Sequence, residues 1–198
     1  MRGDEPCVPA AGDFRVLGKH ERYSSRVFSV HTGKYESPSG VVFERDVLHH
    51  PGAVGVVPLR ASGPGGPSVV LVRQYRPATG EWVLEIPAGL RDVAGEAPEV
   101  TAARELEEEV GFRAGKLKRL FHAYTSPGLS DEELIVYLAT GLEPVGPRPQ
   151  GPEEEFARIC EIPLDEAIEL ALGGEVVDVK TVGGLLAARQ AFFGVTKR

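Results

Sequence analysis

Short runs of apolar and β-branched residues recur along most of this chain, a pattern typical of strands. Within residues 23–50 two such runs flank Ser37-Pro38-Ser39-Gly40, a turn signal, and they predict a small antiparallel meander. In the body of the chain, strands are expected at 53–59, 69–72, 82–86, 118–123, 133–140 and 158–162. The first two of these are separated by a Gly- and Pro-rich segment, 61–67, which predicts a hairpin loop.

Three segments predict helices instead. Residues 98–110 give the clearest pattern, because Pro98 suits the first helical position and Gly111 suits the C-terminal cap. Two more helices are expected at 164–172 and 181–193, whereas the Gly- and Pro-rich segment 146–152 predicts a loop. This mixture predicts an α+β class, with mixed α/β layers. We expect a loose tail at 1–13, the meander at 14–50 and the main domain at 51–198.

Composition restricts the function classes. The 198 residues carry 22 Lys and Arg against 29 Asp and Glu, which argues against a nucleic-acid-binding protein. An anionic small substrate stays compatible with this charge, because a divalent metal can supply positive charge locally. Cys7 and Cys160 could form one disulfide but are more typical of reduced thiols. With no signal-peptide pattern and no long apolar stretch, we expect a soluble, cytoplasmic protein without a membrane partner.

The expected helix at 98–110 has an unusual charge distribution. Its apolar face consists of Ala102, Ala103, Leu106 and Val110. Glu105, Glu108 and Glu109 share a neighbouring face, whereas Glu107 points elsewhere and is expected to be solvated. Like charges at this spacing cost about 0.2–0.5 kcal/mol per pair, and Arg104 is the only basic residue from 96 to 112. Oxygen-binding divalent ions would explain the clustering; an acidic surface helix that only aids solubility is the alternative.

The chain around this helix resembles the Nudix box. That pattern is a glycine, five residues, a glutamate, seven residues, then Arg-Glu-U-x-Glu-Glu-x-Gly-U, with U a bulky apolar residue. Glu96 is followed by seven residues and then by Arg104-Glu105-Leu106-Glu107-Glu108-Glu109-Val110-Gly111-Phe112, which matches at every fixed position. Gly89 departs from the pattern, since six residues instead of five separate it from Glu96. The extra residue falls in a loop, where an insertion costs little.

The flanking segments are similar to the ADP-ribose and ADP-sugar pyrophosphatase branch of that family. They are Arg73-Gln74-Tyr75-Arg76-Pro77, Glu85-Ile86-Pro87-Ala88-Gly89 and Ser126-Pro127-Gly128. The resemblance implies the mixed α/β/α sandwich of the Nudix fold. It also implies that the N-terminal meander is the swapped arm of a homodimer, with Mg²⁺ or Mn²⁺ as cofactor.

The resemblance further assigns roles to residues. Glu105 and Glu109 would be the principal metal ligands, joined by Glu108 and the Ala88 carbonyl, with Arg104 orienting them through a bidentate pair. In this branch the general base often lies in a later loop, where Glu154, then Glu153, are favoured. Residues expected to contact substrate are Arg76 on phosphate, Ser126 and Gly128 beside the terminal ribose, and Glu85. Phe43 and Glu44 could contact adenine, from this or the partner subunit; a core Phe with a solvated Glu is the alternative.

The expected reaction is metal-dependent hydrolysis of ADP-ribose to AMP and ribose 5-phosphate. Another nucleoside diphosphate-sugar or a dinucleotide is the first alternative substrate. The second alternative is a different class, a non-catalytic sensor of the nucleotide. A sensor would be expected to lose the box carboxylates, and all of them are present here.

Overall fold

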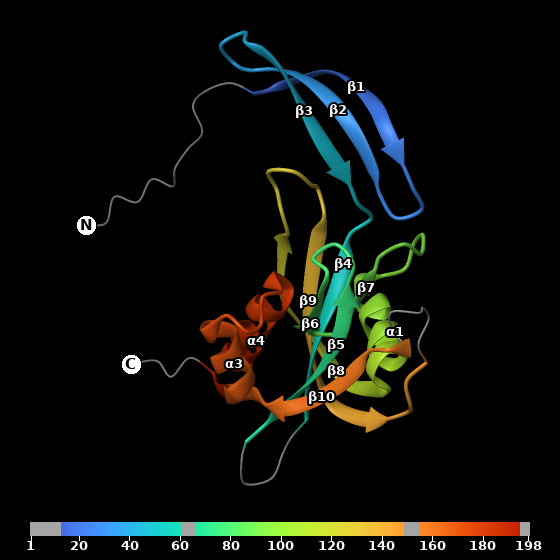
Figure 1. The fold of residues 1–198 in the computed structure, drawn as a ribbon, viewed down its shortest axis with the longest axis vertical. Coiled ribbons are helices and arrows are strands. Elements are labelled where there is room, and N and C mark those ends of the chain that lie inside the picture. The colour runs from blue at the N-terminus through green and yellow to red at the C-terminus, as the bar shows by residue number, and fades with distance from the viewer. Residues whose placement is uncertain (1–12, 61–65, 149–154, 195–198) are drawn as a thin grey trace, which may run out of the picture.

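The computed structural model describes residues 13–60, 66–148 and 155–194. Figure 1 shows a sandwich with a separate N-terminal sheet standing at one end. The elements are β1 (Arg15–Ser24), β2 (Ser29–Glu36), β3 (Val42–His49), β4 (Ala53–Arg60), β5 (Ser68–Arg76), β6 (Glu81–Glu85), β7 (Ala88–Leu90), α1 (Pro98–Val110), β8 (Phe112–Tyr124), β9 (Glu133–Pro144), β10 (Arg158–Pro163), α3 (Leu164–Gly173) and α4 (Val179–Phe193).

The main sheet is mixed and has helices on both faces. Its strand order is β10-β5-β4-β9-β8, with β6 paired to β5 and β7 to β4, and only β4 and β9 among these pairs are parallel. Because side chains alternate along a strand, β4 supplies both cores: Val57 faces α3 and α4, and Val56 faces α1. The predicted α/β/α sandwich is therefore confirmed (Figure 1).

Helix α1 has the predicted bounds, and its ends follow from its sequence. Pro98 begins it, and Gly111 ends it in the left-handed conformation with φ of 71°. A side chain at Gly111 would also collide with the backbone nitrogen of Pro147, only 2.5 Å from the position of a Cβ. Ala102, Leu106 and Val110 are buried against the sheet, which leaves the glutamates on the faces that look away from it.

The N-terminal meander is also confirmed, as the separate three-stranded sheet β1-β2-β3. Its first strand begins at Arg15, earlier than the alternation at 23–50 predicts, and every residue of β1 is exposed. The sheet joins the main body where β3 ends. There the Leu48 N–H donates to the Leu129 carbonyl, the Asp131 N–H donates to the Leu48 carbonyl, and His49 pairs with Asp131.

The remaining departures concern where elements begin and end, and one additional strand. The strand expected at 118–123 is the middle of the thirteen-residue β8, and the short β7 was not expected. Residues 146–148 form no helix or strand, as predicted. The tail at 1–12 and the loop segments 61–65 and 149–152 lie outside the described residues. In the described part of the chain, no helix is both long and apolar enough to cross a membrane.

Candidate active site

The carboxylate face of α1 forms one wall of a cavity of about 520 Å³. Glu105, Glu108 and Glu109 lie on that wall, and the backbone of β7 lies opposite. Arg76 and Pro77, from the end of β5, close another side, and Arg26 reaches the cavity from the hairpin between β1 and β2. The site is therefore built by residues from four separate parts of the sequence.

Glu105 and Gly89 are in very close contact. A Cβ at Gly89 would lie 1.9 Å from the carboxyl carbon of Glu105, a distance that no side chain tolerates. The absence of a side chain at Gly89 therefore lets the Glu105 carboxylate rest against β7. The six-residue spacing between Gly89 and Glu96 does not disturb this contact, because the additional residue is accommodated in the loop before α1.

Arg104 connects the carboxylates to one another. Its Nη1 donates to Glu105 Oε1 at 2.7 Å and to Glu108 Oε2 at 3.0 Å, and its Nη2 donates to Glu96 Oε2 at 3.5 Å. Burial by itself would lower the pKa of Arg104, but the neighbouring carboxylates outweigh it and raise that pKa. The expected orienting role is compatible with this geometry, although Arg104 bridges three carboxylates instead of pairing bidentately with one.

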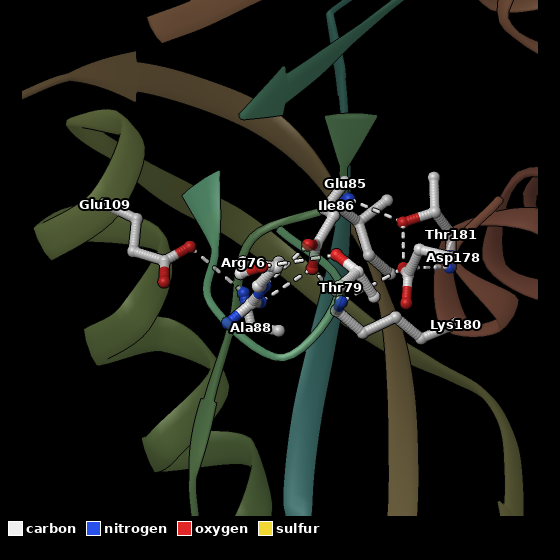
Figure 2. A network of polar contacts seen from close by, with 9 residues as sticks. All are labelled: Arg76, Thr79, Glu85, Ile86, Ala88, Glu109, Asp178, Lys180 and Thr181. Atoms are coloured by element: carbon white, nitrogen blue, oxygen red, sulfur yellow. Dashed lines mark hydrogen bonds and ion pairs between the residues drawn. The ribbon is translucent and has the colours of Figure 1, made fainter. Parts of the chain in front are cut away.

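Glu109 contacts the first residue of β7. The Ala88 N–H donates to Glu109 Oε2 at 3.1 Å, so this carboxylate faces the Ala88 backbone across the cavity (Figure 2). Glu107, by contrast, was expected to be only solvated, and this was wrong. It accepts from Arg113 Nε at 2.7 Å and pairs with Arg148 at 3.6 Å, because Arg113 follows the helix directly and folds back along it.

The donor set of this cavity fits a divalent cation of the oxygen-binding kind. Carboxylates on one helix face and the backbone of β7 offer oxygen ligands, and Gly89 leaves room for them. Within the described residues, no three His, Cys, Asp or Glu side chains already form a closed ligand set.

Arg76 and Glu85 lie together beside this cavity. Arg76 Nε and Nη2 donate to the two carboxylate oxygens of Glu85 at 2.6 and 2.7 Å, and Lys180 Nζ also contacts Glu85 (Figure 2). The Glu85 side chain is 2% exposed, so it lies beneath the cavity wall, whereas Arg76 reaches the surface of that wall. Burial would raise the pKa of Glu85, but its bonds to Arg76 and Lys180 lower it overall.

A second cavity, of about 490 Å³, adjoins the first. The two share Arg76, Ala88, Gly89 and Leu90. The other walls of the second cavity are supplied by the 125–134 region, by His50 and by the first turn of α4, including Lys180. An elongated substrate could therefore run along both cavities and pass Arg76 at their junction.

The remaining predicted substrate residues are not brought together. Phe43 and Gly128 line a third cavity of about 580 Å³, between the N-terminal sheet and the loop before β9. Glu44, the neighbour of Phe43 on β3, lines a different cavity on the opposite face of the sheet. Ser126 sits in the turn between Thr125, which lines the second cavity, and Pro127, which lines the third.

The expected general bases, Glu153 and Glu154, lie outside the described residues. Their neighbour Glu155 lines a small cavity of about 200 Å³ together with Glu109 and Gln74. The segment that follows the expected bases therefore lies next to the carboxylate face of α1.

Sequence reasoning missed the contribution of α4. Asp178 caps this helix by accepting from the Thr181 N–H at 3.0 Å, and Lys180 follows within the first turn. An Asp three residues before a Thr, ahead of a helical pattern, is a capping signal that the sequence did offer. Nothing in the local sequence indicates that this turn meets Glu85, which is ninety-five residues away.

Comparison with known proteins places the chain in a class. The NUDIX domain profile matches residues 49–181, so this chain belongs to the Nudix family. It is 39% identical over 186 residues to an ADP-ribose pyrophosphatase of Mycobacterium tuberculosis, covering 93% of this chain and 87% of that protein. An ADP-ribose pyrophosphatase of Bacillus subtilis is 36% identical over 84% of this chain and 88% of its own length. The crystal structure of an ADP compounds hydrolase matches with a TM-score of 0.78 and 25% identity, covering 94% of this chain and 97% of the other.

Proposed function

We propose that this Nudix enzyme hydrolyses the pyrophosphate bond of ADP-ribose, giving AMP and ribose 5-phosphate. The observation that carries the proposal is the face formed by Glu105, Glu108 and Glu109, packed against Gly89 and bordered by Arg76. A divalent cation would neutralise these carboxylates and, once bound, would attract a phosphate-bearing ligand. The two ADP-ribose pyrophosphatases, each similar over most of this chain, favour ADP-ribose as the substrate.

We assign the cofactor as Mg²⁺, with Mn²⁺ as its substitute, held by Glu105, Glu109, Glu108 and the Ala88 carbonyl. A bound divalent ion supplies charge neutralisation on the phosphates and a more acidic water. Arg104 holds the carboxylates in place through its contacts with Glu105, Glu108 and Glu96. In this assignment Arg104 and Glu108 belong to the catalytic group.

The chain's own residues would then handle the substrate and the proton. Arg76 presents a planar guanidinium where the two cavities meet, suited to a pyrophosphate oxygen. Glu154, then Glu153, is the proposed base that removes a proton from the attacking water. The position of Glu155 beside Glu109 supports a base from this segment.

For the two ends of the substrate, the proposed contacts are Phe43 and Glu44 with adenine, and Ser126 and Gly128 with the terminal ribose. Phe43 and Glu44 face opposite sides of the N-terminal sheet. One adenine could therefore meet both only if one of the two came from a second copy of the chain. Glu85 acts from beneath the wall through Arg76.

The test of this function is phosphorus NMR of the protein with Mg²⁺ and a panel of ADP-ribose, other nucleotide sugars, dinucleotides and nucleoside triphosphates. Rapid formation of AMP and ribose 5-phosphate from ADP-ribose, with the others slow, is the expected result. Preference for another nucleotide sugar or a dinucleotide would contradict the assignment of ADP-ribose as the substrate. No cleavage with any divalent metal would contradict the proposed hydrolase activity and favour a non-catalytic sensor of the nucleotide.

We also propose a cytoplasmic homodimer that exchanges the N-terminal sheet. Phe14, Val16, Leu17 and Tyr23 expose large apolar side chains on or beside β1, and a three-stranded sheet this small needs a partner surface. Sedimentation equilibrium should give the mass of two chains. Val16→Glu, which places a charge on the exposed strand, should shift the equilibrium toward one chain; a wild-type monomer would contradict the proposal.

A further inference from the structure

Glu85 is held by two cations in a place where a lone carboxylate could not remain charged. Its side chain is 2% exposed, and it meets the Arg76 guanidinium on both oxygens and Lys180 Nζ on one. The Lys180 side chain is only 14% exposed, so its charge is also largely removed from water. A buried charge is tolerated only when it is paired and hydrogen-bonded, so the three groups depend on one another.

Asp178 and Thr181 complete a closed ring of contacts around this cluster. Lys180 Nζ lies 3.0 Å from Asp178 Oδ2, which also accepts from the Thr181 hydroxyl. The Thr181 hydroxyl in turn accepts from the Ile86 N–H at 2.8 Å, next in sequence to Glu85 (Figure 2). The first turn of α4 therefore fixes both the Glu85 side chain and the backbone that follows it.

Two members of this ring, Glu85 and Ile86, connect it to the active site. Through Glu85 it sets the direction of Arg76, whose side chain is 42% exposed in the wall shared by the two cavities. Through Ile86 it holds the segment that leads, two residues later, to the Ala88 N–H on Glu109. A displacement of the first turn of α4 would therefore move a phosphate-contacting group and the backbone opposite the carboxylates together.

We propose that Lys180 and Asp178 are positioning residues for pyrophosphate hydrolysis, acting through Glu85 to fix the guanidinium of Arg76 at the phosphate position. This rests on the proposed function, since it gives Arg76 its phosphate contact. Lys180 does not itself need to touch the substrate. Its contribution lies in keeping Glu85 ionised and aimed at Arg76, since a small error in the position of a catalytic or binding group can cost about a hundredfold in rate.

The decisive experiment is a double-mutant cycle between Lys180→Met and Arg76→Ala, measured as kcat/KM for ADP-ribose with Mg²⁺. Arg76→Ala should lower kcat/KM on the order of 100-fold in the wild type. Lys180→Met should lower it roughly tenfold, and in that background Arg76→Ala should cost only about tenfold more. Lys180→Arg, which keeps the charge, should restore activity to within about threefold of the wild type.

A matched control is Lys118→Met. Lys118 is exposed on β8 and lines neither cavity, so this substitution should leave kcat/KM unchanged. Asp178→Asn keeps a side chain that can cap α4 and removes the charge, so it tests the ring from its other end. In the Asp178→Asn background, Arg76→Ala should lower kcat/KM less than it does in the wild type, as expected for the Lys180→Met background. A purely structural role for Lys180 would give independent, additive losses.

The second readout needs no activity. The Arg76 Nε–H resonance, identified by its absence in Arg76→Ala, should be sharp and exchange-protected in the wild type and in Lys180→Arg, but broadened in Lys180→Met. Additive kinetics together with an unchanged resonance would overturn the proposal. If the wild type fails to cleave ADP-ribose, the proposed function falls, and the resonance alone then decides whether Lys180 positions Arg76.

Discussion

Two charged clusters meet at this active site, and they are built on opposite principles. Glu96, just before α1, and Glu105 and Glu108 on it contact the single guanidinium of Arg104, and Glu109 lines the same cavity. Beneath the neighbouring wall, Glu85 and Asp178 are matched by Arg76 and Lys180, so charges of each sign are equal in number. The first cluster faces an open cavity, whereas the second is largely buried.

The two clusters are therefore suited to different tasks. An excess of carboxylates is unstable by itself and becomes useful when a cation arrives from outside. A balanced and largely buried cluster needs no added cation, and it holds its members, including the partly exposed Arg76, in fixed directions. We therefore assign metal binding to α1, and the positioning of the phosphate-contacting Arg76 to the network around Glu85.

Removing one member of the unbalanced cluster should have the largest effect. Glu109→Gln keeps the shape of the side chain and removes one ligand charge, so turnover should fall on the order of 1000-fold while the fold persists. Steady-state kinetics at saturating Mg²⁺, together with circular dichroism, measure both. Near-normal turnover under those conditions would refute the metal assignment.

Removing one member of the balanced cluster should act first on stability. Glu85→Gln removes the carboxylate that lies between Arg76 and Lys180, which should cost about 3 kcal/mol of unfolding free energy. The pKa of Glu85 is lowered from its ordinary 4.5, so its contribution is complete above that pH and is lost as the pH falls through the lower, folded-state pKa.

Urea unfolding at pH 7 and at several lower pH values measures the contribution of ionised Glu85 to stability. The wild type should lose stability more steeply with acid than Glu85→Gln does, because the variant has no carboxylate to protonate. Parallel pH profiles for the two proteins would show that Glu85 is not held in its ionised form.

Filling the contact between β7 and α1 should have an intermediate effect. Gly89→Ala places a methyl group where the Glu105 carboxyl group lies, so the carboxylate must move and kcat should fall roughly 10- to 100-fold. The same substitution made in a Glu105→Ala background should cost much less. An equal loss in both backgrounds would mean that Gly89 acts on something other than Glu105.

The smallest effect is expected at Glu107, on the same helix but outside the cavity. Its pair with Arg113 is exposed, so Glu107→Gln should change turnover by less than about twofold and the thermal midpoint by no more than about 2 °C. This variant is the matched control for Glu109→Gln. A loss comparable to that of Glu109→Gln would mean that total helix charge, and not the face of the helix, determines activity.

The sequence predicted most of the fold and the α1 half of the site because both depend on local patterns. The bounds of α1 follow from Pro98, Gly111 and the apolar spacing, and the same spacing places Glu105, Glu108 and Glu109 together. The network around Glu85 depends instead on a contact between β6 and α4, far apart in the sequence. Glu107 was misjudged for a similar reason, since its partner Arg113 lies beyond the helix end and is brought back only by the path of β8.

The most direct test of the central claim is Mn²⁺ binding followed by electron paramagnetic resonance, compared between the wild type, Glu109→Gln and Glu85→Gln. We predict that the wild type removes the free-ion signal, that Glu109→Gln binds at least tenfold more weakly, and that Glu85→Gln binds as the wild type does. Equal binding by all three proteins, or loss of binding only in Glu85→Gln, would contradict the assignment of the metal to the carboxylate face of α1.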